Sequence, residues 1–393
     1  MMKYRNGKLN ERYGCGRCRW LFMGIVAGVL LGGCTSEDAP PAQVGRTLVV
    51  WLGGDNDLSD ETDDKLASIA LGWDGTGGNL VVYQDRKEQA PRLLQLFAGG
   101  EYRTLHTYEA QNSCDPEVWS RVLREALAAC PAQTYGLLFF SHATGWLPQG
   151  NYPNPATRID PATCTDPATR TIGADGDERM ELADFAAAIP DGQFRFIVFE
   201  ACLMGGIEVA YELRRKSDYL LLSPAEILSP GFTGLYPRLI PLLFGEPAGD
   251  EARLTEFAHT YYEAWNAKTG YSRSSTVSLV RTDALEALAD AARPLMNNAR
   301  EVLPADVTYY DSTSPRLYSD LGDYLQQKSP APEDYLPVSA ALDRAVVYTA
   351  ATPQVMGHPC AVATGLTLYI PRKVFPPLNA AAAQTAWGQA MGN

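Results

Sequence analysis

A cysteine and a histidine each follow an apolar run of this chain. Cys202 comes after the run 194–199, and His142 comes after the run 135–140. Short runs of this kind predict buried β-strands. Because sites in α/β proteins form beyond the carboxyl ends of parallel strands, we expect the thiol and the imidazole to meet there. A thiolate nucleophile beside an imidazole that acts as base and acid is typical of a cysteine hydrolase.

Strand and helix patterns alternate along most of the chain. This alternation predicts an α/β fold with a mostly parallel central sheet, helices on both faces, and a helical insertion or C-terminal portion at about 235–340. Cys202 lies just before a predicted helix, whose N-terminus would favour a thiolate. The predicted strands are 47–52, 79–84, 135–140, 195–199, 218–222, 276–281, 345–348 and 364–370, and the predicted helices are 58–71, 116–129, 182–189, 203–215, 252–268 and 283–302.

The first residues have the organisation of an export signal. Six basic residues precede an apolar stretch at 21–31, which is too short for a typical membrane span. The sequence Leu-Gly-Gly-Cys at 31–34 resembles a bacterial lipoprotein signal, in which Cys34 is lipidated after removal of residues 1–33. Residues 34–46 then form a tether, and residues 47–393 form the folded domain. The alternative is an ordinary secretory signal with a chance cysteine. We expect a lipid-anchored protein of the bacterial cell envelope, at the periplasmic or the outer face of the outer membrane.

The net charge limits the classes of binding partner, and the number of cysteines indicates a free thiol. The whole chain has a formal charge of −13, and loss of six basic residues and one acidic residue with the signal gives −18. So acidic a protein repels nucleic acid and attracts basic substrates. Of the eight cysteines, Cys15 and Cys18 would leave with the signal. The odd number in the folded domain leaves one thiol over if the others pair, and Cys202 is the candidate.

Five segments resemble the clostripain family of cysteine peptidases, which share the caspase-like fold. They run in order over most of the mature chain, from about 47 to 371. Two carry the candidate chemistry: Ser-His-Ala-Thr-Gly-Trp at 141–146 and Glu-Ala-Cys-Leu-Met-Gly at 200–205. The others are Leu-Gly-Gly-Asp-Asn-Asp-Leu at 52–58, Ser-Pro-Ala-Glu at 223–226 and Gly-Leu-Thr-Leu-Tyr-Ile-Pro at 365–371.

The resemblance implies an endopeptidase that cleaves after Arg or Lys, with His142 and Cys202 as a catalytic dyad. The backbone N–H groups of Cys202 and Ala143 would hold the oxyanion. Ala143 stands where the family has Gly, so a left-handed conformation there would strain the loop. A basic substrate side chain needs a carboxylate in its pocket. The candidates for this substrate-binding role are Glu200, in place of the family's Asp, together with Glu226, Asp55 and Asn56.

The proline-bearing segment 147–179 suggests a further family trait, which is self-cleavage between the His and the Cys. Arg158, Arg170 and Arg179 lie in the right interval. No cofactor is required by this chemistry. Some relatives use calcium. The acidic residues at 175–178 are the candidate ligands for it, although their spacing is more typical of a solvated turn.

Two alternatives stay open. One is a catalytically impaired lipoprotein of the same fold that binds peptides or a partner protein, with Ala143 and Glu200 as marks of lost activity. The other is a glycan-binding surface lipoprotein, in which Cys202 and His142 would lie far apart.

Overall fold

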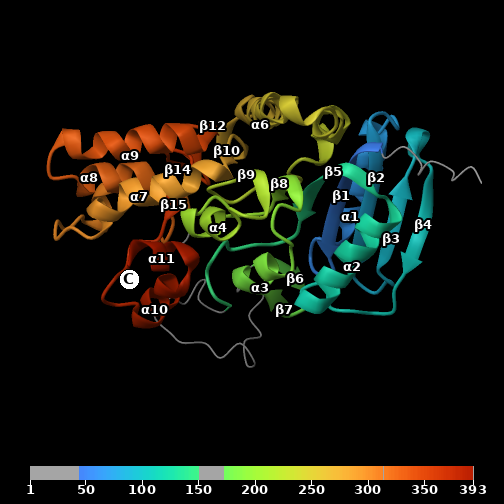
Figure 1. Cartoon of the computed structure of the whole chain (residues 1–393), viewed down its shortest axis with the longest axis horizontal. Helices are drawn as coiled ribbons and strands as arrows, with labels where there is room; N and C mark the ends of the chain where they lie inside the picture. The colour runs from blue at the N-terminus through green and yellow to red at the C-terminus, as the bar shows by residue number, and fades with distance from the viewer. Residues whose placement is uncertain (1–43, 150–171, 313, 393) are drawn as a thin grey trace, which may run out of the picture. The chain divides into compact units, whose positions relative to one another are not determined.

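A nine-stranded sheet forms the centre of the computed structural model, which describes residues 44–149, 172–312 and 314–392 (Figure 1). Five neighbouring strands, β9-β8-β5-β1-β2, are parallel, and the strands beyond them are antiparallel. The mixed α/β fold predicted from the sequence is thus confirmed. In sheet order the strands are β12 (Val346–Ala351), β10 (Thr276–Arg281), β9 (Ser217–Leu222), β8 (Phe194–Glu200), β5 (Ala132–Phe140), β1 (Val44–Gly54), β2 (Gly78–Arg86), β3 (Arg92–Leu96) and β4 (Tyr102–Thr107).

The central strands bury side chains on both faces. In β1, Val49 and Trp51 point into one apolar cluster, while Val50 and Leu52 point into another. The first cluster contains α2 (Pro116–Ala129), α3 (Leu182–Ala187), α4 (Ile207–Glu212) and α7 (Leu285–Met296), and the second contains α1 (Ser59–Gly72), α5 (Tyr236–Leu239) and α6 (Asp250–Asn266). This two-sided burial explains why β1, β5 and β8 read as continuous apolar runs.

The segment 235–340 contains helices but also contributes to the sheet. Strand β10 lies within it and joins β9 to β12. Beside these strands, α7 packs with α8 (Leu321–Lys328) and α9 (Pro332–Ala345), seen in orange in Figure 1. The chain ends with α10 (Pro376–Gln384) and α11 (Ala386–Met391).

Three sequence-based expectations need correction. The strand expected at 364–370 does not join the central sheet, because its two-residue strand β15 (Thr367–Leu368) pairs with β11 (Ser319–Asp320). The helix expected from 203 begins at Ile207, so Cys202 lies in a turn and not at a helix N-terminus. Strands β3 and β4 and the hairpin of β6 (Ile172–Asp175) and β7 (Glu178–Met180) were not anticipated.

Several features predicted from the sequence fall in other parts of the chain. The lipoprotein signal, Cys34, most of the tether, Arg158, Cys164 and Arg170 lie outside the described residues. Within the described ranges, no helix is both long and apolar enough to cross a membrane.

Candidate active site

His142 and Cys202 leave the sheet from neighbouring strands. Phe140 at the end of β5 pairs with Glu200 at the end of β8, and each candidate residue follows two positions later. The two side chains line one cavity of about 180 Å³. Both predicted residues therefore border the same cavity. The cavity is lined by Leu58, Glu61, Lys65, Phe140, Ser141, His142, Glu200, Ala201, Cys202, Ile227, Leu228, Ser229 and Gly231.

The thiol of Cys202 receives a backbone hydrogen bond. The N–H of Ile227 donates to its Sγ over 3.3 Å. A hydrogen bond to sulfur favours the thiolate over the thiol. The sequence suggested a helix N-terminus for this task, and the structure supplies the loop after β9 instead.

The turn that carries Cys202 has an unusual backbone. Leu203 has a φ of 60°, a left-handed conformation that costs a non-glycine residue about 1–2 kcal/mol. Its N–H donates to the carbonyl of Ala225, and the N–H of Gly205 donates to that of Ser223. These bonds fix the turn against the loop that also supplies Ile227.

His142 is held at its side chain and at its backbone. Its Nε2 lies 2.6 Å from Oδ1 of Asp57, which belongs to the loop between β1 and α1. Its carbonyl accepts the N–H of Gly173 in β6. Asp57 belongs to the segment 52–58 that resembles the family, although the residues predicted there for substrate binding are Asp55 and Asn56. The contact makes Asp57 a candidate positioning residue for the imidazole.

Ala143 does not have the strained backbone that its replacement of Gly suggested. Among the described non-glycine residues, positive φ occurs only at Glu88, Leu203 and Met356. The left-handed residue of this loop is Gly145, with a φ of 64°, and a Cβ there would lie 2.5 Å from the carbonyl oxygen of Leu203. The loop after His142 therefore needs its glycine two positions later than the sequence comparison implied.

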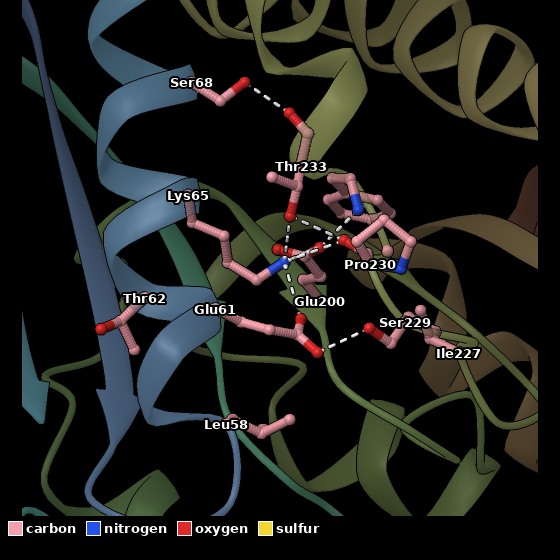
Figure 2. Close-up of polar contacts among 12 residues, drawn as sticks. Leu58, Glu61, Thr62, Lys65, Ser68, Glu200, Ile227, Ser229, Pro230 and Thr233 are labelled. Atoms are coloured by element: carbon pink, nitrogen blue, oxygen red, sulfur yellow. Dashed lines mark hydrogen bonds and ion pairs between the residues drawn. The ribbon is translucent and has the colours of Figure 1, made fainter. Parts of the chain in front are cut away.

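Glu200 reaches the cavity wall but is already paired. Its Oε1 accepts from Nζ of Lys65 at 2.7 Å (Figure 2). The same oxygen accepts from the N–H of Phe232, and Oε2 accepts from the hydroxyl of Tyr236. Lys65 and Glu200 side chains are 0% and 1% exposed. The carboxylate thus has a cation of this chain as its partner.

The other three predicted substrate-binding residues do not line this cavity. Glu226 accepts from the N–H and the hydroxyl of Ser312. Asn56 braces its own loop, since its Nδ2 donates to Ala174 and its Oδ1 accepts from Leu58. Asp55 lies near Asp85, whose pKa is raised mainly by burial and to a lesser extent by the charge of Asp55.

Two carboxyl groups, those of Asp85 and Asp175, lie together beside the acidic turn. Burial, above all, and the nearby charge of Asp175 raise the pKa of Asp85 to about 8, and burial raises the pKa of Asp175 as well. The Asp175 carboxylate also accepts the N–H of Ser113. Within the described parts of the chain, no three His, Cys, Asp or Glu side chains are grouped to hold a metal ion.

The remaining described cysteines are poor nucleophiles. Cys114, Cys130, Cys202 and Cys360 form no disulfide among the described residues. Burial raises the pKa of the Cys114 and Cys130 thiols and raises that of Cys360 to about 11. Cys202 differs in lining a cavity with an imidazole.

Comparison with known proteins identifies the family and the fold. The model of the clostripain family, peptidase family C11, matches residues 50–371. An inactive zymogen of a C11 protease from Parabacteroides distasonis is 28% identical, with a TM-score of 0.76, over 90% of this chain and 99% of that one. A secreted C11 cysteine protease from Bacteroides thetaiotaomicron, in complex with an irreversible peptide inhibitor, is 26% identical, with a TM-score of 0.72, over 88% and 98% of the two chains.

A second secreted C11 cysteine protease from Bacteroides thetaiotaomicron shares the fold, with a TM-score of 0.76 and 18% identity, over 89% of this chain and all of that one. No curated protein matches the chain. The match to the family model spans most of the sequence, including both loops that carry the candidate chemistry. The chain therefore belongs to the clostripain family of cysteine peptidases.

Proposed function

We propose that this protein is a cysteine endopeptidase in which Cys202 is the nucleophile and His142 is the general base and acid. The observation that carries the proposal is the shared cavity, into which neighbouring parallel strands bring the thiol and the imidazole. A thiolate that attacks a peptide carbonyl needs a proton donor for the leaving amine, and an imidazole is suited to that task.

The surroundings support this division of roles. The Ile227 N–H would stabilise negative charge on Sγ, and Asp57 would keep the imidazole oriented. The tetrahedral intermediate would place its oxyanion near the backbone N–H groups of Cys202 and Ala143. Each such donor contributes about 3–4 kcal/mol to lowering the barrier.

The test is turnover of a fluorogenic peptide. Wild type should hydrolyse it, and Cys202→Ala should abolish the reaction. Cys360→Ala is the matched control, since this thiol lies outside the cavity and should be dispensable. Folded wild type without Cys202-dependent turnover of any substrate in a broad peptide library would instead favour the catalytically impaired, peptide-binding alternative.

The residue before the scissile bond is a separate matter. The family resemblance predicts Arg or Lys there. Glu61 and Glu200 supply two carboxylates in the cavity wall, but Lys65 lies between them, 3.7 Å from one and 2.7 Å from the other. A basic preference therefore requires these acids to accept a substrate cation in addition to Lys65. Peptides that differ only at this position, including Arg and Lys, measure the preference.

Self-processing between His142 and Cys202 belongs to the same proposal. The zymogen form of the Parabacteroides relative is in keeping with it. Of the candidate cleavage sites, Arg179 lies in β7, where its side chain donates to the carbonyls of Gly176 and Glu178. Intact-mass analysis should show cleavage within 147–179 for wild type and a single chain for Cys202→Ala. Identical single chains for both would exclude self-processing.

A further inference from the structure

Lys65 is a fully buried cation beside the candidate active site. It comes from α1, and its side chain is 0% exposed. Its ammonium lies 4.2 Å from the centre of the Phe140 ring, and both residues line the cavity shared by Cys202 and His142. A buried charge must be paired, so the partners of Lys65 decide what else this part of the cavity can bind.

The hydrogen-bonding capacity of Lys65 is filled by the protein. Its Nζ donates to Oε1 of Glu200 at 2.7 Å, to Oγ1 of Thr233 at 2.9 Å and to the carbonyl of Pro230 at 3.1 Å (Figure 2). An ammonium group has three N–H donors, and three acceptors are present. Lys65 is thus held as a substrate lysine would be held in a pocket built for a basic side chain.

Glu200 is equally occupied. Lys65 and the Phe232 N–H use its Oε1, and the Tyr236 hydroxyl uses its Oε2. A cationic substrate side chain that reached this carboxylate would have to displace Lys65 or approach it closely. Both are unfavourable, since the first leaves a buried ammonium unpaired and the second brings like charges together without water.

The rest of the cavity favours uncharged groups. Leu58, Phe140, Ile227 and Leu228 contribute apolar walls. The second carboxylate, Glu61, accepts a hydrogen bond from the Ser229 hydroxyl and lies 3.7 Å from Lys65. The two acids in the wall therefore share this one cation, and Glu200 is the closer partner.

We propose that Lys65 is a specificity-determining residue that occupies the cation position of the substrate pocket, so that the enzyme accepts an uncharged side chain before the scissile bond. This inference rests on the proposed peptidase function and names its substrate class. The charge of Lys65 removes the advantage that Glu200 would otherwise give to Arg or Lys.

Two peptides that differ only in Arg or citrulline before the cut test the inference. Citrulline keeps the shape of Arg without its charge. Wild type should show kcat/KM values for the two within about threefold, and Lys65→Met should raise the Arg-to-citrulline ratio at least tenfold by freeing Glu200. Because both substrates are measured on one preparation, the folded fraction cancels from the ratio.

The double variant Lys65→Met/Glu200→Gln is the matched control. It removes both charges, leaves no unpaired buried carboxylate, and should return the ratio to near the wild-type value. If Lys65→Met does not fold, the Arg-to-citrulline ratios of wild type and of the double variant test the inference. Both ratios should then be similar and low. A wild-type preference for Arg above about tenfold, or a Lys65→Met ratio equal to that of wild type, would overturn the inference.

The outcomes also separate the two proposals. Strong, Cys202-dependent cleavage after Arg would overturn the role of Lys65 and leave the peptidase proposal intact. Absence of Cys202-dependent turnover of any peptide would overturn the peptidase proposal, and the specificity inference with it.

Discussion

Asp57 contacts the imidazole of the candidate catalytic histidine. Its Oδ1 lies 2.6 Å from His142 Nε2, although its side chain is 70% exposed to solvent. A carboxylate in this position fixes the orientation of an imidazole and stabilises the imidazolium that forms during catalysis. Solvent exposure weakens the electrostatic part of this effect.

We predict that Asp57→Asn lowers kcat by roughly ten- to hundredfold and leaves KM nearly unchanged, because only the orientation and charge of His142 change. Steady-state kinetics on one peptide checks this. Asp64→Asn, at an exposed position of α1, is the matched control and should retain wild-type kcat. A wild-type kcat for Asp57→Asn would show that the imidazole needs no carboxylate.

At the scale of single residues, the sequence predicted that Cys202 and His142 lie close together. It did not predict which other side chains contact the residues of the cavity. Cys202 and His142 could be found because each follows an apolar strand run. Lys65 could not be found, since its partner Glu200 lies 135 residues away in sequence and nothing in the helix pattern of α1 marks a buried lysine. Asp57 lay within a recognised motif, and only the fold shows that its carboxylate, and not those of its neighbours, faces the imidazole.

The elements themselves were predictable where burial is two-sided or strictly periodic. Strands β1, β5 and β8 read as apolar runs, and α2 has a strong apolar stripe that includes Trp119, Val122 and Ala126. Strand β4 was missed because nearly all of its side chains are exposed, which leaves no alternation to detect. Helix α9 was missed because it begins at Pro332 and contains Pro337, both of which resemble breaks in a helix.

Helix α4 carries a buried acid that ties it to the segment after β15. Oε1 of Glu208 accepts the N–H of Tyr369 at 2.9 Å, while Oε2 has no hydrogen-bond partner among the described residues. Burial raises the pKa of Glu208 from its ordinary 4.5 to about 7. Between these values the folded protein binds the proton more tightly than the unfolded chain does, so stability falls as pH rises.

We predict that Glu208→Gln removes the decrease in stability that Glu208 causes as the pH rises. The free energy of unfolding of the variant, relative to wild type, should increase by about 3 kcal/mol between pH 4.5 and pH 7, because one pKa unit corresponds to 1.36 kcal/mol. Denaturant titrations at several pH values measure it. Glu333→Gln, at an exposed position of α9, is the control. A difference between Glu208→Gln and wild type that stays constant with pH would contradict the prediction.

At the scale of the whole molecule, the sequence predicts separate tasks for the folded domain and the N-terminal extension. Residues 43–393 form one compact unit. The lipoprotein signal predicted for residues 1–33 would leave this unit tethered to a membrane through Cys34, with a formal charge of −18. The proposed anchor and the proposed chemistry should therefore be separable.

We predict that Cys34→Ala moves the protein from the detergent-extracted membrane fraction to the aqueous fraction, since lipid chains supply the membrane affinity. Its kcat/KM on a soluble peptide should equal that of wild type. Partition into detergent followed by immunoblotting measures the change. Retention of the variant in the membrane fraction would show that another feature attaches it.

The central claim concerns one sulfur atom and is tested most directly by labelling. A peptide acyloxymethyl ketone with an uncharged residue next to the electrophile should modify the native protein once, and mass spectrometry of the digested product should place the adduct on Cys202. Cys202→Ala should remain unlabelled, and His142→Ala should react far more slowly. An adduct on Cys360, or none on a protein shown to be folded, would contradict the account.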